Sequence, residues 1–73
     1  MKVYTKSGSC YSFFIFDGSL RAIVQGREII ITDIKDLEVG KRMTISGHAL
    51  NIYCQPQETK TTATTSVIVK IED

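Results

Sequence analysis

The sequence contains few of the residues that metal sites and acid–base catalysts need. Its 73 residues include one histidine, His48, and two cysteines, Cys10 and Cys54, which lie far apart. A structural zinc site takes four such ligands, so we expect no metal site within one chain. A lone histidine in a strand pattern is typical of a surface or interface residue. We therefore expect no enzymatic activity, no catalytic residue and no cofactor.

Long apolar segments are also missing. The strongly apolar runs, such as Ile29-Ile30-Ile31, are far too short to cross a bilayer. The start of the chain, Met1-Lys2-Val3-Tyr4, leads straight into a strand pattern without the apolar region of a signal peptide. We expect a cytoplasmic protein with two free, largely buried thiols, and a Cys10–Cys54 disulfide is the alternative.

Neither sign of charge dominates. Nine basic and eight acidic residues give a net charge of +1. This balance is too weak for a binder of duplex DNA and argues against an acidic DNA mimic. A small anionic ligand, which needs only two or three well-placed cations, remains compatible with it.

The length of the chain predicts a single small domain over residues 1–73. Apolar residues make up 42% of the sequence and charged residues 23%, an ordinary globular balance. Ordering so short a chain costs roughly 110 kcal/mol of conformational free energy, which a small core barely offsets. Because metals and disulfides are not expected, self-association is the remaining source of stability, and we expect a homo-oligomer without a membrane partner.

Short strand patterns run through most of the chain. They cover residues 2–5, 10–16, 20–25, 28–32, 42–46, 48–54 and 67–72. Tight turns are expected at 6–9, 17–18 and 25–27, and residues 33–40 suit one helical or 3₁₀ turn. The pattern predicts an all-β fold: a small antiparallel β-barrel or β-sandwich of six to seven short strands, with at most one short helical turn.

Three segments carry more specific expectations. Residues 10–16 are apolar on both faces, so one face is expected on the core and the other against a partner subunit or a ligand. In the last strand Val67, Val69 and Ile71 are expected to point inward. The polar stretch 55–66 is expected to form a loop, extended in its distal part, and long loops in compact domains are often functional.

The short polar patch Ser7-Gly8-Ser9 has two interpretations. Gly8 and the serines suit a tight turn. The same residues, with Lys6 alongside, could form a nest of N–H and hydroxyl groups that accepts an anion. The turn would create the nest, so both interpretations can hold together.

Aromatic and cationic residues alternate along the chain in a way that suits a nucleotide pocket. Tyrosine rings can stack on a base, and arginine forks can pair with phosphate. The full set of candidate ligand-binding residues is Tyr4, Lys6, Ser7, Gly8, Ser9, Tyr11, Arg21, Arg27, Arg42, Tyr53, Thr64, Thr65 and Ser66. The threonines and Ser66 are expected to close over the ligand as part of the loop.

Two other functions fit the same inventory. Interleaved aromatics and cations on a small barrel are also typical of proteins that bind single-stranded RNA or DNA. A module that inhibits or scaffolds a host protein, for example by adding an edge strand to it, would need neither nucleotide nor nucleic acid.

Three short segments resemble small bacteriophage-type proteins that open on a T-x-S-G-S-x-Y pattern and close on a T-S-(P)-V-x-x-I strand. The segments are Tyr4-Thr5-Lys6-Ser7-Gly8-Ser9-Cys10-Tyr11, Leu37-Glu38-Val39-Gly40 and Thr65-Ser66-Val67-Ile68-Val69-Lys70-Ile71. The resemblance implies a phage-encoded accessory protein that acts in the host cytoplasm. Compact phage proteins of this kind bind and sequester nucleotide immune signals, either cyclic oligonucleotides or ADP-ribose derivatives, without cleaving them. We therefore expect an anti-defence protein with a small nucleotide as its ligand.

Overall fold

A computed structural model describes residues 1–53 and 55–73, and it is built from antiparallel strands. The strands are β1 (Lys2–Thr5), β2 (Cys10–Phe16), β3 (Ser19–Val24), β4 (Arg27–Lys35), β5 (Arg42–Ala49) and β6 (Thr61–Glu72). The all-β prediction is confirmed.

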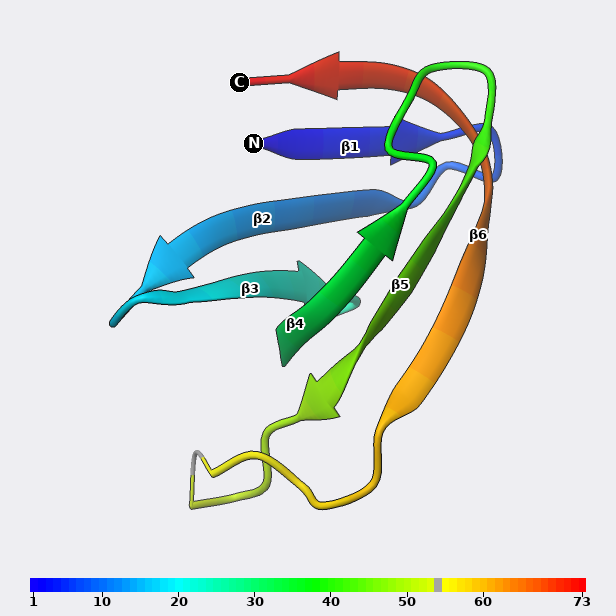
Figure 1. Cartoon of the computed structure of the whole chain (residues 1–73). Coiled ribbons are helices and arrows are strands. Elements are labelled where there is room, and N and C mark those ends of the chain that lie inside the picture. The colour runs from blue at the N-terminus through cyan, green and yellow to red at the C-terminus, as the bar shows by residue number, and fades with distance from the viewer. Residues whose placement is uncertain (54) are drawn as a thin grey trace.

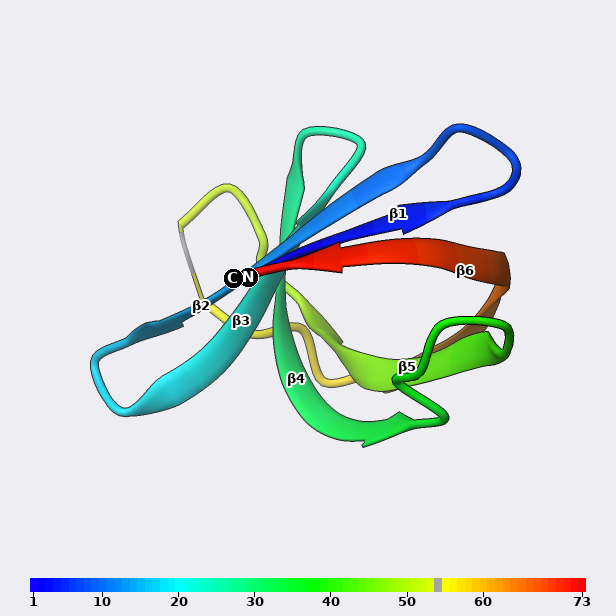
Figure 2. The ribbon, with the colours of Figure 1, turned by 90° about the horizontal axis from the view of Figure 1, so that it is seen from above.

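The sheet closes into a barrel rather than a sandwich. Each strand pairs with the next in the chain, and β1 also pairs with β6 to complete the ring. The two ends of the chain therefore lie side by side, as Figures 1 and 2 show. Because every connection joins neighbouring strands, short turns suffice for most of them.

Two hairpins follow the expected turn chemistry. Phe16 pairs with Ser19 across Asp17 and Gly18, whose φ values are 52° and 76°. Two consecutive residues with positive φ make the turn that matches the twist of the flanking strands, and Asp-Gly is suited to it. Gln25 and Gly26 repeat the arrangement between β3 and β4. The tight turns predicted at 17–18 and 25–27 are confirmed.

The core inside the barrel is small. Its buried apolar side chains come from all strands except β4, which adds half-buried isoleucines around them. The buried set is Val3, Phe13, Ala22, Met43, Ile45 and Ile68. So small a core leaves the domain marginal in stability, as expected for this chain length.

The predicted inward face of the last strand is correct for Ile71 and wrong for Val69. Ile68 is fully buried, whereas Val69 is more than half exposed. The register of β6 against β1 shifts between Tyr4 and Thr5, which pair with Lys70 and Ile68. An extra residue of this kind reverses which side chains point inward, so Ile68 and Ile71 both reach the core.

The helical turn predicted for residues 33–40 is also wrong. Strand β4 continues to Lys35, and a register shift between Ile31 and Asp33 lets both Ile31 and Ile34 pack on the core. Ile34 and Leu37, three positions apart, made the segment look helical, and both pack on the core from an extended chain. The chain then turns through Asp36, which has a φ of 59°.

The polar stretch 55–66 divides into two parts. Residues 55–60 connect the strands, but β6 begins at Thr61, so Thr64, Thr65 and Ser66 lie in a strand and not in a loop. The strand predicted over 48–54 ends early, because β5 stops at Ala49. Threonine is a good strand former, and pairing with β5 orders this polar segment.

The thiol of Cys10 is exposed on β2, contrary to the expectation that it is buried, and Cys54 lies outside the described residues. Within residues 1–53 and 55–73, no helix is long and apolar enough to span a membrane. Nor do three His, Cys, Asp or Glu side chains of these residues gather at a spacing that could hold a metal ion.

Candidate functional site

One end of the barrel opens into a cavity of about 210 Å³, which we call the barrel mouth. Five strands contribute to its wall. The lining residues are Tyr11, Val24, Arg27, Ile29, Ile45, Gly47, Ala49, Thr61, Ala63, Thr64 and Thr65. Figure 1 shows the strands diverging toward the end at which β5 joins β6.

The strand register explains one side of the barrel mouth. Tyr11 pairs with Val24, and Val24 pairs with Arg27, so the three side chains form a row across β2, β3 and β4. Paired residues of antiparallel strands point to the same face of the sheet. The tyrosine ring and the guanidinium group therefore stand on the same wall of the cavity.

The opposite side comes from the β5–β6 hairpin. Gly47 pairs with Thr61, and Ile45 pairs with Ala63. Gly47 also allows β4 to approach closely, since a Cβ there would lie 2.2 Å from the backbone oxygen of Ile30. The small residues keep the cavity open, and Ala63 is exposed although it lies on the inner face.

Some polar side chains of the barrel mouth are already hydrogen-bonded within the chain, and others are open to a ligand. Among the described residues, Arg27 has no ion-pair partner, and its exposed side chain is open to solvent. Thr65 is already engaged: its Oγ1 accepts from the Met43 N–H at 3.2 Å and donates to the Ser66 carbonyl at 2.8 Å. The oxygens of Thr64 and Thr44 lie 3.3 Å apart. Of the predicted site residues, the structure brings Tyr11, Arg27, Thr64 and Thr65 together here.

A second group of predicted residues gathers at the β1–β2 turn, which packs against the middle of β6. Ser7 lies at its centre: its Oγ is 3.0 Å from Thr5 Oγ1, 3.4 Å from Ser9 Oγ and 3.1 Å from Ser66 Oγ. The turn predicted for Ser7-Gly8-Ser9 is confirmed, with Gly8 at a φ of 91°.

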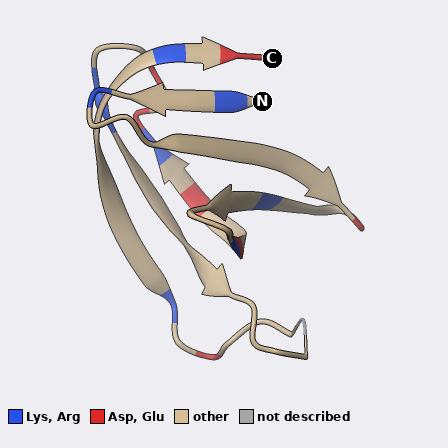
Figure 3. Ribbon diagram, turned by 180° about the vertical axis from the view of Figure 1, so that it is seen from behind, with Lys and Arg blue, Asp and Glu red and all other residues tan. Residues whose placement is uncertain are grey.

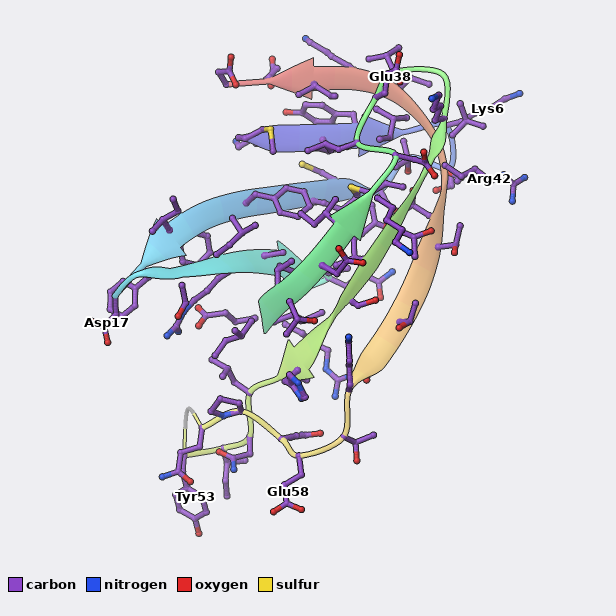
Figure 4. The ribbon with its side chains drawn as sticks, viewed as in Figure 1. Lys6, Asp17, Glu38, Arg42, Tyr53 and Glu58 are labelled. Carbon is purple, nitrogen blue, oxygen red and sulfur yellow. The ribbon has the colours of Figure 1, made fainter. Side chains whose placement is uncertain are left out.

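Three backbone N–H groups of this turn are already bonded within the chain. Lys6 N–H donates to the Val67 carbonyl, Ser7 N–H to Ser66 Oγ, and Gly8 N–H to the Thr5 carbonyl. These groups hold the turn against β6 and are not free to hold an anion. What remains for a ligand is charge, because Lys6 and Arg42 both project from this end, as Figure 4 shows.

Tyr4 lies apart from both groups, on the outer face of β1. Its hydroxyl donates to Glu72 Oε2 at 2.8 Å, and Lys70 Nζ lies 3.1 Å from Glu72 Oε1. The hydrogen bond to the carboxylate raises the pKa of Tyr4 to about 12. The same bond, together with Lys70, lowers the pKa of Glu72.

Arg21 and Tyr53 also lie away from the barrel mouth. Arg21 Nη1 is 2.6 Å from Glu28 Oε2, and its guanidinium carbon stands 5.0 Å from the centre of the Phe16 ring. Tyr53 is exposed in the connection between β5 and β6. Arg21 is thus occupied by its own chain.

His48 serves the connection rather than the cavity. Its Nδ1 lies 2.8 Å from the Gln57 carbonyl oxygen, which ties the connection back to β5.

Several small residues that line the barrel mouth were not among the predicted site residues: Gly47, Ala49, Thr61 and Ala63. Small residues alternating along two strands are the only sequence signal for them, and that signal is weak.

Comparisons of this chain with protein-family models, with curated proteins and with solved structures found no match.

Proposed function

We propose that this protein binds a nucleotide in the barrel mouth and sequesters it without cleaving it. The observation that carries the proposal is the placement of the Tyr11 ring and the exposed Arg27 side chain on one wall of an apolar cavity. Stacking of a base on an aromatic ring and pairing of phosphate with an arginine are the usual means by which proteins hold nucleotides.

The size of the cavity sets the part of the ligand that enters. Pockets that enclose a whole drug-sized molecule measure roughly 300–1,000 Å³. At about 210 Å³, the barrel mouth suits one nucleobase, with the sugar and phosphate at the rim beside Arg27. The apolar floor of Val24, Ile29 and Ile45 fits the faces of a base, and the exposed threonines offer hydroxyls to its edges.

Sequestration is the role that the resemblance to phage accessory proteins implies, with a cyclic oligonucleotide or an ADP-ribose derivative as the signal. Such a role requires only tight binding. It suits a site whose polar groups are an arginine, a tyrosine and threonines.

A single-stranded nucleic-acid binder is less well supported. Such proteins track the backbone with a continuous line of cations. Figure 3 shows Lys and Arg dispersed among Asp and Glu, and in the described part of the chain three cations are paired with carboxylates.

Titration calorimetry with a panel of mononucleotides, cyclic di- and trinucleotides and ADP-ribose tests the proposal. We expect one saturable site, lost in Ala63→Leu, which fills the cavity, and weakened at least tenfold in Arg27→Gln. The matched control is Thr62→Leu, because Thr62 lies beside Ala63 on β6 but points to the opposite face of the sheet. Arg42→Gln, at the other end of the barrel, should also bind as the parent does.

Two results would contradict the proposal. The first is the absence of binding across the panel. The second is binding that survives Ala63→Leu but is lost in Arg42→Gln, which would move the site to the β1–β2 turn. Affinity that grows with oligonucleotide length and falls steeply with salt would favour a single-stranded nucleic acid instead.

A further inference from the structure

The end of the β2–β3 hairpin extends beyond the barrel as a two-stranded arm, residues 14–20. The pairing of β1 with β2 ends at Lys2 and Ser12, and the pairing of β3 with β4 ends at Arg21 and Ile30. Within the arm, β2 and β3 pair only with each other in the described part of the chain. Figures 1 and 2 both show the hairpin end standing away from the other strands. A two-stranded ribbon has little stability of its own, and its edges are open to another strand.

The arm is apolar on both faces. Ile15 is 76% exposed, Phe16 60% and Leu20 38%. Taking roughly 200 Å² for a large side chain, these residues expose an area on the order of 350 Å². This area is summed over both faces of the arm, and it is about half of what one partner buries in a standard interface.

The β2 edge of the arm offers free backbone groups at Ile15. Phe13 and Met1 exchange two backbone hydrogen bonds, Phe13 N–H to Met1 O at 2.8 Å and the Met1 amine to Phe13 O at 3.1 Å. Backbone groups of a strand point to the same edge every second residue. The N–H and C=O of Ile15 therefore point to this edge too, where the described residues supply no partner.

The sequence at this edge is self-complementary. In an antiparallel pair related by a two-fold axis through Ile15, each Ile15 faces its own copy, and Phe14 faces Phe16 of the partner subunit. The palindrome Phe14-Ile15-Phe16 thus places four phenylalanines on one face of the joined sheet. Aromatic pairs across strands are among the most stabilising of such contacts.

Charge does not oppose this pairing. Asp17 is the one ionisable residue among residues 14–20. In the antiparallel arrangement the two copies of Asp17 stand four residues apart along the strands, roughly 13 Å. Salt screens exposed charges at that separation, since the Debye length is about 8 Å.

We propose that two copies of this protein associate through their β2 edges, with Ile15 of each copy paired to Ile15 of the other in a short antiparallel pairing over residues 14–16. The two-fold relation makes the interface closed, so the product is a dimer and not a fibre. The modest apolar area makes the dimer dissociable on dilution. This proposal is independent of nucleotide binding, because the arm contributes no residue to the barrel mouth.

Sedimentation equilibrium over a range of concentrations tests it. We expect a monomer–dimer equilibrium in the parent protein and a monomer in Ile15→Lys, which puts a charge on the edge. The matched control is Ile52→Lys, because Ile52 is 89% exposed but lies in the connection between β5 and β6. Circular dichroism checks that each variant is folded.

Amide hydrogen exchange tests the register itself. The Ile15 amide should exchange slowly at high concentration and at least tenfold faster on dilution. The Phe14 and Phe16 amides point toward β3 and should change less. A parent protein that stays monomeric, or a dimer that survives Ile15→Lys as well as it survives Ile52→Lys, would overturn the proposal.

Discussion

Ser7 and Ser66, 59 positions apart in the chain, are joined by two hydrogen bonds. The Ser7 N–H donates to Ser66 Oγ at 3.1 Å, and Ser66 Oγ–H donates to Ser7 Oγ at 3.1 Å. The pair fastens the β1–β2 turn to β6 at the seam where the first and last strands close the barrel. Its role is therefore to stabilise the closure.

Removal of the Ser66 hydroxyl should weaken this seam. We expect Ser66→Ala to lower the free energy of unfolding by about 1 kcal/mol, the usual effect of losing such bonds near the surface. Ser66→Thr retains the oxygen and should recover most of the loss. Urea denaturation monitored by circular dichroism measures both. Equal stability of Ser66→Ala and the parent would show that the seam does not depend on this hydroxyl.

A side chain at Gly47 should be far more damaging. A Cβ there would lie 2.2 Å from the Ile30 carbonyl oxygen and 3.0 Å from Ile29 Cγ2, so the β4–β5 pairing would have to shift. We expect Gly47→Ala to destabilise the fold by about 3 kcal/mol or more. Gly18→Ala meets no atom within 4 Å and should cost about 1 kcal/mol from its positive φ alone. A Gly47→Ala variant as stable as Gly18→Ala would contradict the close approach of the two strands.

The Arg21–Glu28 pair should contribute more than an exposed pair. The side chain of Arg21 is 16% exposed and that of Glu28 34%, with 2.6 Å between their charged atoms. Glu28→Gln should cost about 1–2 kcal/mol, because a half-buried guanidinium loses its charged partner. Glu38→Gln breaks the exposed pair with Lys41 and should leave stability nearly unchanged, because solvent screens the two charges. Thermal or urea unfolding measures the stability of both variants. Equal losses in Glu28→Gln and Glu38→Gln would show that the Arg21–Glu28 pair contributes no more than the exposed pair.

The Tyr4–Glu72 hydrogen bond should make stability depend on alkaline pH. The pKa of Tyr4 is about 12 in the folded protein, against about 10 for a free tyrosine. The folded state holds this proton more tightly, so the stabilisation is complete below pH 10 and is lost as pH rises toward 12. Tyr4→Phe should lose less stability over that range than the parent protein, as measured by urea midpoints. Parallel pH profiles of the two proteins would contradict this.

Local sequence patterns predicted the strands and turns that depend on neighbouring residues. Asp17-Gly18 predicted a hairpin because these residues accept positive φ, and the structure has it. The patterns failed where a register shift intervened. The inward position of Ile68 depends on how β6 pairs with β1, which residues near Ile68 in sequence cannot specify.

The candidate site was predictable only in part, for the same reason. Tyrosine and arginine were recognisable as ligand-binding types, but their grouping was not. Tyr11 and Arg27 lie on the same wall of the barrel mouth because two strand registers align them through Val24. Arg21, six positions from Arg27, points to the outer face and pairs with Glu28.

By itself, the sequence determined that this chain forms short antiparallel strands joined by tight turns, since alternation and turn chemistry act over a few residues. The tertiary structure alone decided the closure of β1 on β6, the grouping of the serines into the seam, and the lining of the barrel mouth. Those features join residues as far apart as Ser7 and Ser66, and such pairings depend on the register of the whole sheet.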